Sequence, residues 1–203
     1  LYKLILQQNS RSVSDALNEE QQIMRKRARP KIVLATCYDE AVELYRKYKD
    51  NILGVISDVG FVLHKGDKRE TEIKDAGLDL CRLIKSEIPT MPYLLQSSQE
   101  SMREVAQQMG VGFVCKTSKT LTHELSEYIG REFGFGDFVV TDPASGKVIA
   151  RARDLYEFEK LIESMSDESL RYLSSRNYIS RWLYGRGLCS IGDMFRPIAI
   201  NES

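Results

Sequence analysis

The sequence lacks the features that mark several common classes of protein. Its four cysteines lie far apart, form no Cys-x-x-Cys pair, and are too sparse for a disulfide scaffold in 203 residues. No apolar run approaches the roughly 18 residues that a membrane-spanning helix needs. The 29 basic and 29 acidic residues cancel, so no net charge attracts nucleic acid or an anionic membrane. These absences favour a soluble, cytoplasmic protein that binds neither DNA nor membranes.

Other absences concern catalysis and the start of the chain. The two histidines, His64 and His123, have no second histidine or cysteine at metal-binding spacing, so we expect both at the surface. The chain has no glycine-rich phosphate loop and no nucleophile elbow, which argues against an α/β enzyme. It begins at Leu1 without a methionine or a signal-peptide pattern, and we therefore expect it to be part of a longer protein.

From residue 31 onward, short apolar runs alternate with amphipathic segments, as in a parallel sheet covered by helices. Four runs are too short for helices and apolar on both faces, which is typical of buried strands: residues 31–36, 52–57, 91–96 and 112–116. Apolar residues at helical spacing predict helices at residues 39–48, 76–87, 102–109 and 121–129. The pattern predicts an α/β domain with a doubly wound parallel sheet.

A second, smaller unit follows. Two glycines in the motif Phe133-Gly-Phe-Gly-Asp137 predict the end of the first domain, which we place at residues 1–133. Residues 134–203 predict a small α+β unit, with a β-hairpin around the turn-rich residues 142–146 and helices at 155–165, 166–184 and 190–195. Trp182 is expected to anchor its core. A unit of roughly 70 residues is near the lower limit for folding unaided, so we expect it to dock on the first.

Residues 1–30 allow two interpretations. Either residues 2–7 form a strand that a helix at 12–28 follows, or residues 1–28 form one long helix and the first strand lies upstream of Leu1. The local pattern does not decide between them.

Polar residues suited to phosphoryl chemistry stand at the ends of three predicted strands. Asp58 follows residues 52–57, Ser97 and Ser98 follow residues 91–96, and Lys116 ends the last strand. Ligands of an open parallel sheet bind beyond the carboxyl ends of its strands. There a carboxylate can accept a phosphoryl group, a lysine can pair with its oxygens, and a hydroxyl can hydrogen-bond one of them. We prefer Ser97 to Ser98 because of its offset from Pro92.

Four motifs carry a family resemblance: Gly54-Val-Ile-Ser-Asp58-Val-Gly60, Ala76-Gly-Leu-Asp-Leu-Cys-Arg-Leu-Ile84, Pro92-Tyr-Leu-Leu-Gln-Ser97-Ser98 and Gly110-Val-Gly-Phe113-Val-Cys-Lys116. Over about residues 31–133 the sequence resembles the receiver (CheY-like) domain of two-component response regulators. The resemblance implies a flavodoxin-like fold with strand order 2-1-3-4-5. It also implies that Asp58 is the phosphoacceptor, that Ser97 and Lys116 contact the phosphoryl group, and that Phe113 is a switch residue that changes rotamer.

The resemblance further implies a Mg²⁺ ion, held by Asp58, the backbone carbonyl of Gly60 and an acidic pair after the first strand. No such pair is visible, because Gln7 and Gln8 would stand in its place if residues 2–7 were the first strand. We therefore favour a first strand, and the remaining acidic ligands, upstream of Leu1. The sequence departs from the family in two other ways: Thr117 stands where a proline is usual, and the loop at residues 61–75 is long and highly charged.

The motifs Asp142-Pro-Ala-Ser-Gly146 and Ser175-Arg-Asn-Tyr-Ile-Ser-Arg-Trp182-Leu183 resemble a small unit that follows receiver-like regions in a narrower group. The proteins of that group carry a phosphoenolpyruvate synthase type of PEP/pyruvate-binding domain. This implies that the chain is the regulatory front of a larger protein, which could be a PEP/pyruvate-utilising phosphotransferase. Residues 151–203 carry eight basic and eight acidic side chains, which argues against a DNA-binding output.

The expected function is that of a phosphoacceptor signal receiver in a two-component-type phosphorelay, not that of an enzyme in this region. Its expected partners are a histidine kinase or a small phosphodonor, and an attached or separate output domain. The alternative is a pseudo-receiver that acts without phosphorylation as a scaffold or dimerisation module, in which case a homodimer is expected.

Overall fold

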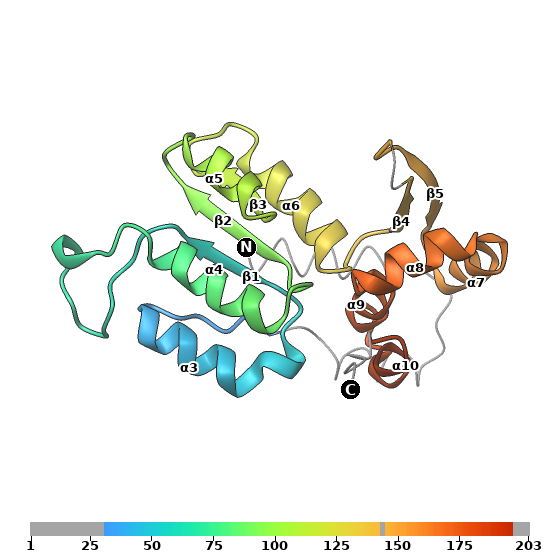
Figure 1. Ribbon diagram of the computed structural model, residues 1–203, viewed down its shortest axis with the longest axis horizontal. Coiled ribbons are helices and arrows are strands. Elements are labelled where there is room, and N and C mark those ends of the chain that lie inside the picture. Colours follow the sequence, from blue (N-terminus) through green and yellow to red (C-terminus); the bar gives the residue numbers. More distant parts are fainter. Residues whose placement is uncertain (1–30, 143–144, 197–203) are drawn as a thin grey trace. The chain divides into compact units, whose positions relative to one another are not determined.

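The computed structural model describes residues 31–142 and 145–196 (Figure 1). The contacts within the chain divide these residues into two compact units. Residues Lys31–Leu125 form one unit, and the described residues from Ser126 onward belong to the other. The domain boundary that we predicted after residue 133 stays a prediction, as do both interpretations of residues 1–30, which lie outside the described residues. No helix in the described part of the chain is long and apolar enough to cross a membrane.

The first unit contains a parallel sheet of three strands in the order β1-β2-β3. The strands are β1 (Val55–Asp58), β2 (Tyr93–Ser97) and β3 (Gly112–Cys115). Val55 pairs with Tyr93 and Leu94 pairs with Gly112, so the carboxyl ends of all three strands meet at one edge. The predicted α/β class with a parallel sheet is confirmed.

Helices surround this sheet because its strands are apolar on both faces. These helices are α3 (Tyr38–Tyr48), α4 (Ala76–Glu87) and α5 (Met102–Gln108), with short 3₁₀ turns at η1 (Lys49–Asn51) and η2 (Arg69–Thr71). A further helix, α6 (Leu121–Glu132), begins in this unit, and its residues from Ser126 onward belong to the other. Tyr93, Leu94 and Leu95 in β2 are all at most 1% exposed although successive side chains point to opposite faces. Tyr45 of α3 and Ile84 of α4 belong to the core cluster against this sheet.

The predicted strand at residues 31–36 is wrong. This segment has no regular secondary structure, and Ile32, Val33 and Leu34 are 41%, 55% and 76% exposed. A strand needs a neighbour for its backbone hydrogen bonds, and none of the described strands pairs with this segment. Its apolar composition alone therefore did not make it a strand.

The second unit combines a hairpin with helices, as predicted. The hairpin strands are β4 (Phe138–Thr141) and β5 (Val148–Ala152), which pair antiparallel. The helices are α7 (Leu155–Ser164), α8 (Asp167–Ser175), α9 (Tyr178–Gly185) and α10 (Cys189–Met194). The Asp154 side chain accepts a hydrogen bond from the Glu157 amide and thereby caps the start of α7.

The single helix predicted at residues 166–184 is in fact two helices, α8 and α9. Asn177 between them has a φ of 59°, in the left-handed region that interrupts a helix and that asparagine tolerates better than most residues. The Arg181 guanidinium donates hydrogen bonds to the carbonyls of Arg176 and Asn177. The break is therefore stabilised by a side chain from the following turn.

Trp182 lies at the centre of the core of this unit, as predicted. It is 2% exposed, and its ring stacks on Phe158 with ring centroids 4.7 Å apart and meets Phe138 edge-on at 5.6 Å. The indole N–H donates to the Gly136 carbonyl at 3.1 Å. The hairpin, α7 and α9 thus share one aromatic cluster.

Beside this cluster, main chain packs on main chain. A Cβ atom on Gly134, whose φ is +80°, would lie 2.5 Å from the Arg181 carbonyl oxygen, and a Cβ on Gly185 would lie 2.5 Å from the Gly134 oxygen. The buried Arg186 guanidinium covers the Trp182 ring at 3.5 Å and donates to the carbonyls of Gly134 and Gly136. This close packing allows only glycine at both positions.

Candidate functional site

The three residues predicted to carry phosphoryl chemistry lie at the same edge of the sheet. Asp58 is the last residue of β1, Ser97 is the last residue of β2, and Lys116 directly follows β3. In the strand register Asp58 lies opposite Gln96 and Ser97 lies opposite Cys115. The parallel arrangement of the strands is therefore what brings these residues, far apart in the sequence, to one place.

Asp58 and Lys116 form a direct ion pair across this edge. The Lys116 Nζ atom lies 2.7 Å from Asp58 Oδ1, while the two side chains remain 37% and 49% exposed, respectively. A pair this open to water stabilises a fold by about 1 kcal/mol or less. The pair leaves the carboxylate accessible from solvent, with a cation already beside it.

The backbone of Asp58 is held by the start of α4. The Gly77 amide donates to the Val59 carbonyl at 2.8 Å, and a Cβ atom on Gly77 would lie only 2.0 Å from the Asp58 carbonyl oxygen. The Ser57 hydroxyl donates to the same Asp58 oxygen at 2.8 Å, and the Tyr93 hydroxyl donates to the Gly77 carbonyl at 3.0 Å. Sequence reasoning gave Gly77 no role, although it stands in the motif of residues 76–84 and in the first turn of a predicted helix.

Ser97 makes one hydrogen bond that joins two strand ends and one within the loop that follows β2. Its carbonyl accepts from the Lys116 amide at 2.8 Å, and its hydroxyl accepts from the Gln99 amide at 3.1 Å. The neighbouring Ser98 accepts through its carbonyl from the Cys115 thiol, with a sulfur–oxygen distance of 3.9 Å. These contacts do not test which of the two hydroxyls serves a phosphoryl group, and the preference for Ser97 stays a prediction.

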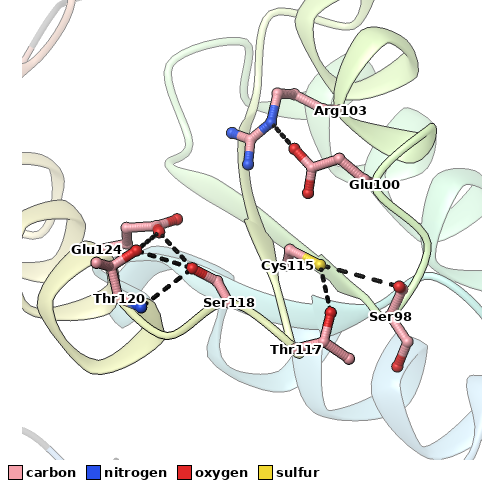
Figure 2. Close-up of polar contacts among 8 residues, drawn as sticks. All are labelled: Ser98, Glu100, Arg103, Cys115, Thr117, Ser118, Thr120 and Glu124. Carbon is pink, nitrogen blue, oxygen red and sulfur yellow. Dashed lines mark hydrogen bonds and ion pairs between the residues drawn. The ribbon is translucent and has the colours of Figure 1, made fainter.

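Phe113, the predicted switch residue, is buried in β3 with 9% of its surface exposed. The Arg103 guanidinium of α5 covers its ring, 5.0 Å from the ring centroid. Arg103 in turn pairs through Nε with the Glu100 carboxylate (Figure 2). This charged hydrogen bond holds the pKa of Glu100 below its usual value. The sequence did not predict that Arg103 lies over Phe113, since the two residues belong to different elements.

The loop after Lys116 is ordered by hydroxyl groups, as Figure 2 shows. The Thr117 hydroxyl lies 3.1 Å from the Cys115 sulfur, and the Glu124 carboxylate accepts hydrogen bonds from the hydroxyls of Ser118 and Thr120. These bonds, with that of Thr120 first, lower the pKa of Glu124. Thr117 thus stands in a loop that side-chain hydrogen bonds anchor to the start of α6.

The long charged loop at residues 61–75 is held by a bridge within itself and by hydrogen bonds to the start of α3. Phe61 and Ile73 form an antiparallel bridge, and the Tyr38 amide donates to the Val62 carbonyl at 3.0 Å. The exposed His64 imidazole lies 2.6 Å from an Asp39 carboxylate oxygen. Because Asp39 accepts this hydrogen bond, the pKa of His64 is raised above its ordinary value.

The expected Mg²⁺ ligands are represented only in part. Gly60 lies two residues beyond Asp58, and the Glu72 carboxylate stands against it, since a Cβ on Gly60 would lie 2.9 Å from Glu72 Oε1. Within residues 31–142 and 145–196, no three acidic, histidine or cysteine side chains are grouped as a metal site. Asp58 and the Gly60 carbonyl are oxygen ligands of the kind that Mg²⁺ prefers, but they do not form a complete set of protein ligands.

The second unit contains a separate, small pocket. Its volume is about 180 Å³, below the roughly 300–1,000 Å³ usual for small-molecule sites. None of the residues predicted from the sequence to handle phosphate lines it; its lining includes Glu132, Asp137, Thr141, Leu173, Tyr178 and Trp182. The Asp58 edge of the first unit is therefore the candidate site.

Comparison with known proteins adds no family to these observations. No protein-family model, curated protein or solved structure matches the chain.

Proposed function

We propose that the chain is a phosphoacceptor signal receiver of a two-component-type phosphorelay. One observation carries the proposal: the exposed Asp58 carboxylate lies 2.7 Å from the Lys116 ammonium, where the carboxyl ends of parallel strands meet. On this proposal the fold is flavodoxin-like with order 2-1-3-4-5, and β1, β2 and β3 are its third, fourth and fifth strands.

The chemistry assigns a separate role to each residue. An Asp58 oxygen attacks the phosphorus of the donor, and the bond from phosphorus to the donor's leaving group breaks as the aspartyl phosphate forms. Lys116 moves its ion pair from the carboxylate to the phosphoryl oxygens, and the Ser97 hydroxyl donates a hydrogen bond to one of them. A Mg²⁺ ion held by Asp58 and the Gly60 carbonyl would neutralise further negative charge on the transferred group.

The donor in this proposal is a histidine kinase or a small phosphodonor in the cytoplasm. The output is the second unit or a domain beyond it, and a PEP synthase-like catalytic domain is the output that the sequence resemblance favours. The region itself catalyses no further reaction.

Two observations favour a second candidate, a pseudo-receiver that serves as a scaffold or a homodimerisation module without phosphorylation. The described residues provide Asp58 but no further acidic group that completes a metal site with it. In addition, Ile32, Val33 and Leu34 are exposed, and residues 31–36 do not form the predicted strand. An incomplete metal site and an exposed apolar segment, both among the described residues, fit a module that binds a partner without turning over phosphate.

Phosphoryl uptake separates the two candidates. The full-length protein is incubated with Mg²⁺ and acetyl phosphate, and intact-mass spectrometry measures the addition of one phosphoryl group. We expect uptake that Asp58→Asn abolishes and that Lys116→Met slows strongly. Asp79→Asn is the matched control, because Asp79 is also an exposed carboxylate in an ion pair, with Arg82. Absence of uptake, or equal uptake by Asp58→Asn, would replace the receiver with the scaffold.

A further inference from the structure

The small pocket of the second unit has both an apolar part and a charged part. Residues of α6, β4, α8 and α9 line it. Its apolar part consists of Phe138, Leu173 and Trp182, which are 3%, 1% and 2% exposed. Its volume of about 180 Å³ is slightly larger than the roughly 150 Å³ of a cavity that holds benzene. The pocket therefore has room for a ligand of about six to eight non-hydrogen atoms.

Arg131 brings hydrogen-bond donors to this pocket that are mostly unused. Its Nε atom donates to Glu132 Oε1 at 2.8 Å, and within the part of the chain that the structure describes this is the only hydrogen bond of the guanidinium. The side chain is 65% exposed, so its two Nη groups are open to a ligand. A guanidinium presents such groups as a planar fork that binds a carboxylate through two parallel hydrogen bonds.

Asp137 brings an unused acceptor to the same pocket. Its side chain is 40% exposed, and its nearest cation is Arg151, whose Nη1 atom lies 3.5 Å from Asp137 Oδ2. That distance is longer than an ordinary hydrogen bond. No donor among residues 31–142 and 145–196 is hydrogen-bonded to either oxygen of this carboxylate. An ammonium group, which has three donors and no acceptor, suits it.

Glu132 also lines the pocket, but the chain itself compensates its charge. Its side chain is only 17% exposed, and it accepts hydrogen bonds from Arg131 and, at 3.4 Å, from the Tyr178 hydroxyl. It also attracts the buried Arg181 guanidinium. The unsatisfied groups that remain in the pocket are therefore one cationic donor, on Arg131, and one anionic acceptor, on Asp137.

We propose that this pocket binds a free α-amino acid with a short apolar side chain, about the size of valine. The carboxylate of the ligand binds the Nη groups of Arg131, and its ammonium group binds Asp137. Its side chain packs against Phe138, Leu173 and Trp182. A ligand with only one of the two charges leaves Arg131 or Asp137 without its partner. The site is independent of phosphoryl transfer, and the inference holds whether or not the first unit accepts a phosphoryl group.

Titration of the full chain with L-valine tests the proposal. Trp182 is the single tryptophan of the sequence and lines the pocket, so its fluorescence reports occupation. Isothermal titration calorimetry measures the stoichiometry, which should be one. We expect a saturable response to L-valine. Isobutylamine lacks the carboxylate of valine and 3-methylbutanoate lacks its ammonium group, so both should bind much more weakly.

Four variants locate the binding. Arg131→Gln and Asp137→Asn should each weaken the binding of L-valine by about tenfold or more, because each removes charged hydrogen bonds. Arg82→Gln and Asp79→Asn remove a comparable exposed ion pair on α4 and should leave binding unchanged. Urea unfolding of the two pocket variants should give nearly native stability, since both side chains are partly exposed.

Three results would overturn the proposal. The first is the absence of a saturable response to L-valine in the native chain. The second is binding of isobutylamine or 3-methylbutanoate as tight as that of L-valine, which would mean that the pocket does not recognise both charges. The third is unchanged binding of L-valine in Arg131→Gln and Asp137→Asn, which would place the amino acid elsewhere on the chain.

Discussion

A single added methyl group at Gly77 should disturb the structure around Asp58. In Gly77→Ala the new Cβ would lie 2.0 Å from the Asp58 carbonyl oxygen, 3.0 Å from its carbonyl carbon and 3.1 Å from the Val59 Cα. All three atoms belong to the main chain of the sheet edge, so no flexible side chain can move aside. The start of α4 and the end of β1 must therefore separate by more than about 1 Å.

The size of the effect follows from two opposing contributions. Overpacking of a well-packed interior costs roughly 1–3 kcal/mol, and a clash with backbone belongs at the upper end of that range. Alanine is better than glycine in a helix by about 1 kcal/mol, which offsets part of this cost. We expect Gly77→Ala to lower the free energy of unfolding of the first unit by about 2 kcal/mol.

Urea unfolding followed by circular dichroism measures the change in free energy, and hydrogen exchange of peptides from β1 and α4 locates it in the first unit. Ser86→Ala on the same helix is the control, because Ser86 is exposed and its replacement also raises helix propensity. We expect that variant to be within about 0.5 kcal/mol of the native chain. A Gly77→Ala chain as stable as the native one would show that the close packing of α4 on Asp58 is not needed.

Two further predictions concern Arg186 and His64. Both Arg186→Met and Arg186→Lys should lower the free energy of unfolding by about 3 kcal/mol, because buried carbonyls lose the planar donor that satisfies them. Urea unfolding followed by Trp182 fluorescence measures this change. An Arg186→Lys chain as stable as the native one would contradict the prediction. The hydrogen bond to Asp39 raises the pKa of His64. The contribution of this bond to the stability of the fold is therefore complete below the ordinary imidazole pKa, and it is lost as pH rises through the raised pKa of His64. Amide hydrogen exchange of residues 61–75, corrected for intrinsic rates, should therefore accelerate in the native chain as pH rises from the ordinary imidazole pKa through the raised pKa of His64. The same acceleration is expected in His123→Gln but not in His64→Gln. Unchanged protection of these residues in the native chain over this pH range would refute the prediction.

Much of the first unit could be predicted from the sequence because buried parallel strands have a simple signature. Short apolar runs located β1, β2 and β3 to within a few residues. Once the strands were parallel, their carboxyl ends had to meet, and this placed Asp58 and Lys116 at one edge before any distance was known. The prediction succeeded because it depended on strand direction alone.

The predictions that were wrong depended on partners or on single dihedral angles. Residues 31–36 have the composition of a strand, but a strand also requires a neighbour, which composition does not report. The break at Asn177 depends on one left-handed residue inside a pattern that is amphipathic on both sides.

Contacts between distant elements were equally hidden. The approach of Gly77 to Asp58, and of Arg103 to Phe113, joins residues that no local pattern connects. Such contacts become visible only when the elements are assembled in three dimensions.

The packing of Gly134 against Gly185 in the second unit also determines how distant relatives of this chain can be recognised. Residue types at the surface and the sizes of core side chains can change during evolution. At Gly134 and Gly185 the peptide planes are in direct contact and leave no room for any side chain. Chains that share this unit should therefore retain a short signature, glycine at positions 134 and 185 with arginine at position 186 and tryptophan at 182, long after their overall identity has faded.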